Sequence, residues 1–230
     1  MRATDGEIGK VKEFYFDDLS WAIRYLIIET GNWLSNRKVL ISPQALQLPD
    51  WKNKEFPINL TKQQIKNSPD IDTNKPISHR QEIEMYRHYA WERYGGNGFY
   101  AGSSAAVMNL SAVVDEKTIK ENDPAGSRAN DDPHLRSTER VSGYHIHATD
   151  GDIGHVNDFI IDDEVWKITD LVIDTHNWIG GHKVLVPARH VKEIQWENFK
   201  IIIDVSREYV KDCQVFNEPE FVFPQNIFEI

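Results

Sequence analysis

The feature of this sequence that most constrains its fold is a long internal repeat. The stretch "ATDGEIGKVKEFYFDD" at residues 3–18 returns as "ATDGDIGHVNDFIIDD" at residues 148–163, displaced by 145 positions. The same offset, without gaps, aligns further aromatic and polar residues: Trp21 with Trp166, Trp33 with Trp178, Trp51 with Trp196, and Thr61 with Ser206. About half of the positions between 3 and 41 are identical to their counterparts. The chain therefore contains two copies of one supersecondary unit.

Each copy has the pattern of consecutive short strands. The dipeptides Asp5-Gly6 and Asp150-Gly151 predict tight corners, and Gly9 and Gly154 predict a bulge or a close backbone approach just beyond. The segments that follow are rich in β-branched and aromatic residues, with an Asp-Asp pair between them, which favours hairpins over helices. Thr61 and Ser206 each predict the start of a short helix, and Gln64 completes a capping box in the first copy alone. This pattern predicts a small β-barrel in each copy.

The predicted boundaries divide the chain into four parts. Residues 1–69 form the first copy, 70–140 a linker, 141–216 the second copy and 217–230 a tail. Within the linker, "ISHRQEIEMYRHYAWERY" predicts a helix, because Ser78 can cap it, Gln81 stands three residues on, and apolar residues up to Tyr94 recur near helical spacing. We expect a polar loop to follow it.

Composition excludes several classes of protein. No apolar run approaches the roughly 20 residues that a membrane-spanning helix needs, and the N-terminus lacks signal-peptide features. We therefore expect a cytoplasmic protein. Cys213 is the single cysteine, which excludes intrachain disulfides and multi-cysteine metal clusters. The net charge of −10 opposes binding to nucleic acid phosphates, so a nucleic acid partner is not expected.

The stretch "DGEIGKVKEFYFDDLSWAIRYLIIETGNWLSNRKVLISP" resembles the PRC-barrel domain, which is found in the cytoplasmic part of the photosynthetic reaction centre H subunit and in a ribosome-maturation factor. The resemblance covers both copies. It implies a mainly β fold with two small antiparallel PRC-type β-barrels joined by a partly helical linker. The residues that carry it are Asp5, Gly6, Gly9, Asp17, Asp18, Trp21 and Trp33, with Asp150, Gly151, Gly154, Asp162, Asp163, Trp166 and Trp178 in the second copy.

The family resemblance implies a non-catalytic module for binding or assembly, with no cofactor. Two alternatives stay open: an enzyme that uses the histidine-rich second copy, and an accessory protein docking on a reaction-centre-like membrane complex. The candidate metal ligands are His145, His147 and His155, which could share one side of a hairpin. The first copy has no histidine at the matching positions, where Lys10 corresponds to His155, and this favours surface histidines without a metal. No catalytic residue is expected, since neither a nucleophile elbow nor a nucleotide-binding glycine pattern is present.

We expect self-association or a protein partner. The second copy is preceded by "VSGYHIH", a predicted first strand, whereas little precedes the corresponding Ala3, so we expect the first barrel to lack most of that strand. An unpaired edge invites another segment or chain, and the candidate cover residues are Tyr86, Phe221, Val222 and Phe223. Residues 1–69 have a net charge of +2 and residues 141–230 of −9, which favours contacts between first-copy edges, or between first and second copies, over contacts between two second copies.

Overall fold

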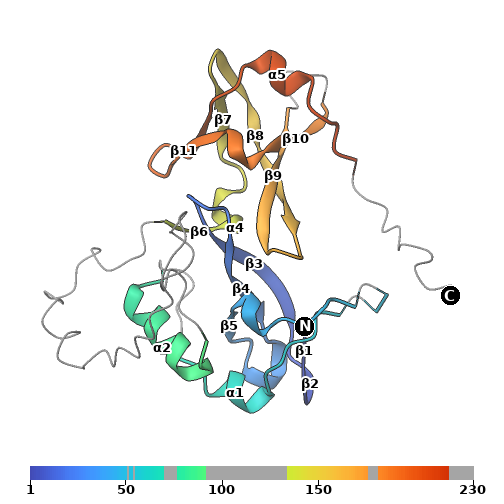
Figure 1. Ribbon diagram of the computed structural model, residues 1–230, viewed down its shortest axis with the longest axis vertical. Helices are drawn as coiled ribbons and strands as arrows, with labels where there is room; N and C mark the ends of the chain where they lie inside the picture. The colour runs from blue at the N-terminus through green and yellow to red at the C-terminus, as the bar shows by residue number, and fades with distance from the viewer. Residues whose placement is uncertain (51, 54, 70–76, 92–133, 176–180, 218–230) are drawn as a thin grey trace, which may run out of the picture. The chain divides into compact units, whose positions relative to one another are not determined.

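The computed structural model describes residues 1–50, 52–53, 55–69, 77–91, 134–175 and 181–217 (Figure 1). Its strands are β1 (Arg2–Ala3), β2 (Gly6–Glu7), β3 (Lys10–Asp17), β4 (Ile23–Glu29), β5 (Lys38–Ile41), β6 (Leu135–Ser137), β7 (His145–Ala148), β8 (Gly151–Asp162), β9 (Lys167–Asp174), β10 (Lys183–Pro187), β11 (Val191–Gln195) and β12 (Lys200–Ile203). Its α-helices are α1 (Lys62–Lys66), α2 (His79–Tyr89), α4 (Thr138–Val141) and α5 (Arg207–Lys211), and its 3-10 turns are η1 (Gly31–Leu34), η2 (Pro43–Ala45) and η4 (Ala188–His190). The chain forms two compact units, residues 1–67 with 134–230 and residues 68–133.

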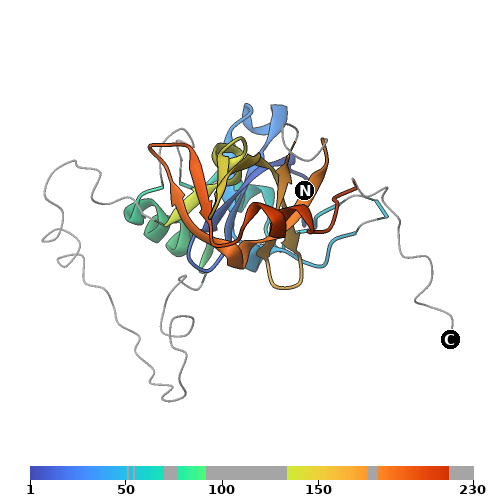
Figure 2. The same cartoon turned by 90° about the horizontal axis from the view of Figure 1, so that it is seen from above.

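The second copy is a six-stranded sheet in the order β10-β9-β8-β7-β12-β11. Four of its five strand pairings are antiparallel, but β7 and β12 pair in parallel, with Ile146 opposite Ile201. This parallel pair departs from the antiparallel prediction, and it arises because the first strand of the copy lies beside a late strand that runs in the same direction. The helix α5 follows β12 and packs against β8 and β10 (Figure 2).

The first copy repeats these pairings at the 145-residue offset. Arg2 forms a parallel bridge with Pro57, as His147 does with Ile202, and Leu46 forms an antiparallel bridge with Ile58, as Val191 does with Ile203. The buried core positions also correspond: Ile8 with Ile153, Leu26 with Leu171, Ile28 with Ile173, Ile41 with Val186, Ile58 with Ile203, and Ile65 with Val210. The prediction that the two repeats fold alike is confirmed.

The corner glycines occupy equivalent conformations. Gly6 and Gly151 have φ values of +139° and +140°, in a region that residues with a Cβ rarely adopt. The carboxylate just before each glycine accepts the first backbone N–H of the helix that ends the copy: Asp5 from Lys62 at 2.8 Å, and Asp150 from Arg207 at 2.7 Å. Each Asp-Gly dipeptide therefore forms the corner through its glycine and binds the following helix through its aspartate. These two roles explain why the dipeptide occurs in both copies.

A short segment from just before the second copy completes the sheet of the first. The strand β6 pairs antiparallel with β3, with Tyr15 opposite Ser137, and forms the fourth strand in the order β5-β4-β3-β6. The helix α4 follows directly, and the Thr138 hydroxyl accepts the backbone N–H of Phe14 at 3.1 Å. The sequence analysis placed residues 135–140 in the linker and did not predict this strand.

The second unit is described by residues 68–69 and 77–91. Its helix α2 begins at the predicted capping box, in which Ser78 and Gln81 exchange hydrogen bonds. It ends at Tyr89, earlier than predicted, because Ala90 takes a left-handed conformation with φ of +55°. The Trp91 ring then stacks on Tyr89, with centroids 4.2 Å apart, and its backbone N–H returns to the Tyr86 carbonyl. Tyr94 lies outside the described residues.

Candidate functional site

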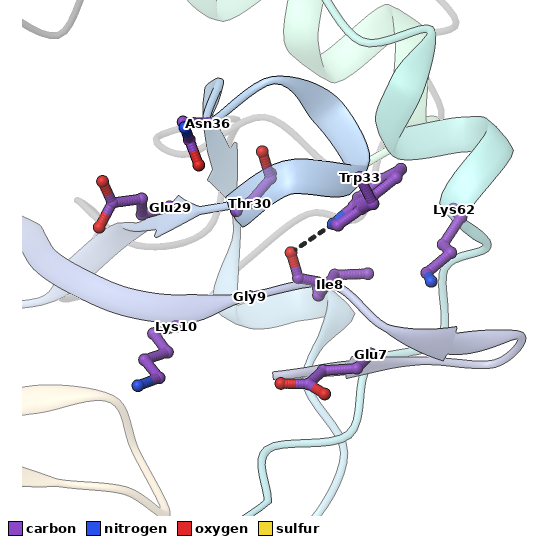
Figure 3. Close-up of a pocket in the computed structure, with 10 residues that line it drawn as sticks. Glu7, Ile8, Gly9, Lys10, Glu29, Thr30, Trp33, Asn36 and Lys62 are labelled. Atoms are coloured by element: carbon purple, nitrogen blue, oxygen red, sulfur yellow. Dashed lines mark hydrogen bonds between the residues drawn. The ribbon is translucent and has the colours of Figure 1, made fainter.

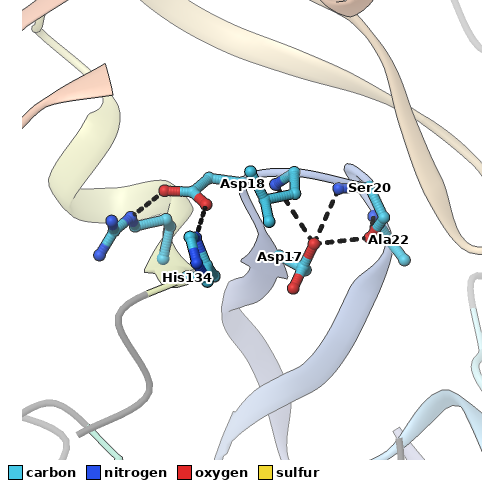
Figure 4. A network of polar contacts seen from close by, with 7 residues as sticks. Asp17, Asp18, Ser20, Ala22 and His134 are labelled. Atoms are coloured by element: carbon cyan, nitrogen blue, oxygen red, sulfur yellow. Dashed lines mark hydrogen bonds and ion pairs between the residues drawn. The ribbon is translucent and has the colours of Figure 1, made fainter. Parts of the chain in front are cut away.

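The hairpin between β3 and β4 ends in a turn that is organised by Asp17. Its carboxylate accepts the backbone N–H groups of Leu19 and Ser20, at 3.2 and 2.8 Å, and the Ser20 hydroxyl at 2.8 Å (Figure 4). Asp17 is 3% exposed, so these donors replace the water it has lost. In the second copy, Asp162 accepts the N–H groups two and three residues on in the same way, at 2.9 and 3.2 Å. We call these two turns, residues 17–21 and 162–166, the hairpin tips.

The neighbouring Asp18 has a different role in the first tip. It forms an ion pair with Arg136 on β6, at 2.5 Å, and a hydrogen bond with the His134 ring, at 2.9 Å (Figure 4). The Arg136 guanidinium also lies over the ring of Trp196 in the second copy, 4.4 Å from its centroid. Arg136 thus contacts both copies through one side chain, with a cation–π contact on one side and a carboxylate on the other.

The two tips meet directly. Ala22 forms an antiparallel bridge with Lys167, its own counterpart at the 145-residue offset. The backbone N–H of Ile23 donates to the Trp166 carbonyl, and the backbone N–H of Ile168 donates to the Trp21 carbonyl, both at 2.8 Å. Ala22 and Lys167 are counterparts at the repeat offset, and the offset also converts each of the two hydrogen bonds into the other. We call this contact the seam.

Aromatic side chains fill the seam. Phe16 stacks on Trp21 with centroids 5.4 Å apart and contacts Phe159 of the second copy at 5.9 Å. In the reverse direction, Trp166 contacts Phe56 of the first copy at 6.4 Å. Both tip tryptophans have left-handed backbones, with φ of +63° and +51°. This conformation, which is unfavourable for a bulky residue, therefore occurs at the same place in both copies, at the seam.

A groove of about 610 Å³ lies at the corner of the first copy, away from its tip. It is lined by Glu7, Ile8, Gly9, Lys10, Glu29, Thr30, Gly31, Trp33, Asn36 and Lys62. The Trp33 indole donates to the Ile8 carbonyl at 2.7 Å, and Lys62 lies 5.2 Å from the centre of its ring (Figure 3). Two lysines and two glutamates on one concave, partly aromatic surface suit a zwitterionic or mixed-charge segment of a polypeptide.

The family model of the PRC-barrel domain matches residues 2–62 and 143–210. The chain belongs to the PRC-barrel domain family. The two matches coincide with the two copies, so this is a tandem PRC-barrel protein, as the sequence resemblance implied. A search of curated proteins gives no match. No helix within the described part of the chain is long and apolar enough to cross a membrane.

The PRC-barrel motif residues lie at two places in each copy. Asp5, Gly6, Gly9 and Trp33 lie at the corner and groove, whereas Asp17, Asp18 and Trp21 lie at the hairpin tip. Their second-copy counterparts follow the same division, except that Trp178 lies outside the described residues. Of the predicted cover residues, Tyr86 is buried on α2, and Phe221, Val222 and Phe223 lie outside the described residues. The role of Arg136 was not predicted, because this residue lies outside the repeat and has no counterpart that would point to it.

The second PRC-barrel places its candidate metal ligands in separate contacts. His145 lies opposite His155 in the β7–β8 pair, but a bulge between Ile146 and His147 shifts the register. His147 pairs instead with Asp152, at 2.7 Å, and this hydrogen bond lowers the pKa of the Asp152 carboxyl. Among the described residues, no three His, Cys, Asp or Glu side chains are grouped to hold a metal ion.

One carboxyl group is buried where the first PRC-barrel meets β6. Glu13, on β3, is 6% exposed and accepts a short hydrogen bond from the Ser137 hydroxyl. Burial raises the pKa of Glu13, because the low-dielectric surroundings disfavour the charged form. Its counterpart Asp158 is exposed, since no equivalent of β6 covers that position among the described residues. Burial at this contact therefore favours the protonated form of Glu13, whereas the hydrogen bond from Ser137 favours its charged form.

We expect Glu13→Gln to change how stability depends on pH. In the wild type, the unfolded state loses its Glu13 proton near the usual glutamate pKa, and the folded state does so at higher pH. The free energy of unfolding therefore falls as pH rises between those two values. The glutamine keeps the hydrogen bond to Ser137 without ionising. Urea unfolding from pH 4 to pH 8 should show the variant gaining stability relative to the wild type as pH rises, whereas Glu197→Gln, at an exposed site, should run parallel to the wild type.

Proposed function

We propose that this tandem PRC-barrel protein is a non-catalytic binding and assembly module. The observation that carries the proposal is the seam, where the motif residues shared by both copies form a contact between domains. Asp17 and Asp162 shape the tips, and the carbonyls of Trp21 and Trp166 accept the hydrogen bonds that join the two copies there. Asp17 and Trp21 are buried and Asp162 and Trp166 are half-buried, and all four are hydrogen-bonded to the backbone, as in residues that build an interface.

The groove of the first copy is the surface that we assign to a protein partner. It combines a tryptophan, which is the kind of anchor that dominates binding energy at interfaces, with four charged side chains around it. In the second copy the matching position of Lys10 is His155 and that of Asn36 is Gly181, so the two corners present different side chains. We therefore assign the two corners different partners, or a partner to the first corner alone.

Neutralising the groove tests the proposal. The double variant Lys10→Gln/Lys62→Gln should lower recovery of the native partner about tenfold, because charges at an interface rim control association. A photo-crosslinking residue at Asn36, on the groove, should form an adduct with that partner, and the same residue at Lys66 should not.

The matched control is Lys52→Gln/Lys66→Gln, which changes the net charge by the same amount outside the groove. It should leave both recovery and crosslinking at the wild-type level. Equal losses in the two double variants would show a general effect of charge and would contradict the assignment of the groove.

A further inference from the structure

The seam has the geometry of a two-fold interface. Ala22 meets its counterpart Lys167, and the two hydrogen bonds exchange the same pair of positions, with Trp21 and Ile23 on one side and Trp166 and Ile168 on the other. A contact in which position i meets position j, and j meets i, is the mark of a self-complementary surface, as in symmetric homodimers. Each tip is therefore shaped to fit another tip of the same kind.

The contacts of the seam do not depend on the connection between the copies. Its two hydrogen bonds join backbone groups of the tips, and its ring contacts use Phe16, Phe56 and Phe159 beside the tip tryptophans. All of these residues lie within the two PRC-barrels, outside the linker, residues 70–140. When the seam within a chain opens, a tip from a second chain can supply the same groups.

Charge selects which tips pair between chains. The first copy has a net charge of +2, whereas residues 141–230 have −9, so two second copies repel each other. A first copy facing a second copy of another chain has no such repulsion. The side chains at the bridge also favour a first tip with a second tip. The uncharged Ala22 faces Lys167 there, whereas two second-copy tips would bring two lysines together.

We propose that the hairpin tip is a docking surface for a PRC-barrel of a second copy of this chain, in which the first copy of one chain takes the second copy of another. This inference rests on the proposed assembly function and names one partner for it. It concerns a surface separate from the groove, so the two can fail independently.

Cysteine crosslinking between chains tests the proposal. The hydrogen bonds on either side of Ala22 and Lys167 make them a non-hydrogen-bonded antiparallel pair, whose Cα atoms lie about 4.5 Å apart. That spacing allows a disulfide. One chain carries Ala22→Cys and the other Lys167→Cys, each with Cys213→Ser to remove the native thiol and each with its own affinity tag. The two full-length chains are coexpressed and oxidised.

The expected result is a disulfide-linked dimer that carries both tags and increases with protein concentration. Its yield should exceed by at least tenfold that of a control pair with cysteines at Leu48 and Glu193, which are exposed counterparts at the same 145-residue offset. Crosslinking of a single chain with both Ala22→Cys and Lys167→Cys reports the seam within one chain and shows that the variants fold.

Two outcomes would overturn the proposal. One is efficient crosslinking within the double-cysteine chain with no two-tag dimer at any concentration, which would show that the seam forms only within a chain. The other is a two-tag dimer no more abundant than the Leu48 and Glu193 control, which would show random collision. In either case the groove test is unaffected, because neither substituted position lines the groove.

Discussion

Gly9→Ala is expected to unfold the first PRC-barrel or to lower its free energy of unfolding by at least about 3 kcal/mol. A Cβ at this position would lie 2.0 Å from the backbone carbonyl oxygen of Glu29, far inside any tolerated contact, and the φ of +142° is itself unfavourable for alanine. The neighbour in the clash is main chain on β4, so it cannot rotate away. Gly154→Ala should act in the same way in the second copy, where the Asp174 carbonyl oxygen would lie at 1.9 Å.

Gly31→Ala is the matched control for this prediction. Gly31 also has a positive φ, of +63°, but no atom lies within 4 Å of its added Cβ. Its substitution should cost about 1 kcal/mol, the usual penalty of a left-handed alanine. Urea unfolding followed by tryptophan fluorescence gives both values. Similar losses for Gly9→Ala and Gly31→Ala would show that backbone conformation, and not the close approach of β4, explains the glycine.

The fold could be predicted because the sequence contains two copies of the same structural unit. Asp5-Gly6, Gly9 and the Asp17-Asp18 turn each have a counterpart 145 residues later, so a position required by the backbone could be recognised without any other protein. The structure places them at the corner, at the close approach to β4 and at the hairpin tip. Strands whose side chains alternate between two faces, with turn residues at fixed spacing, specify the hairpins and their turns from local sequence alone.

The parts that were not predicted lack a local pattern. The strand β6 is only three residues long and stands outside the repeat, so its pairing with β3 depends on tertiary contacts of Arg136 and Ser137. The parallel pairing of β7 with β12 joins segments more than 50 residues apart, and strand propensity carries no information about direction. The end of α2 at Tyr89 was missed because Ala90 is an ordinary helix former that here takes a left-handed conformation.

The seam could not be recognised from the sequence for a related reason. The repeat shows that Trp21 and Trp166 are equivalent, but equivalence does not imply contact. Contact depends on backbone groups at the start of two strands, the N–H groups of Ile23 and Ile168, which donate to the Trp166 and Trp21 carbonyls. Self-complementarity is a property of the assembled pair of domains.

Substitution of the aspartate at a hairpin tip is also expected to cause a large loss in the free energy of unfolding. Asp17→Ala should lower the free energy of unfolding by about 2–4 kcal/mol, because it removes the acceptor of two backbone N–H groups and a hydroxyl at a buried site. The equivalent Asp162→Ala removes the acceptor of two backbone N–H groups at a half-buried site. Water can replace the carboxylate there, so the substitution should lower the free energy of unfolding by about 1 kcal/mol. Urea unfolding of the two variants side by side measures the difference.

Asp17→Asn separates the charge of this residue from its hydrogen bonds. The amide oxygen can still accept the N–H groups of Leu19 and Ser20, so Asn should recover more than half of the stability that Ala loses, as expected for an aspartate that organises a turn. Because the first tip faces the second across the seam, the loss in Asp17→Ala should be accompanied by faster hydrogen exchange at the Ile168 amide, which donates to the Trp21 carbonyl. Unchanged exchange at Ile168, together with the full loss of stability, would mean that the turn and the seam are energetically independent.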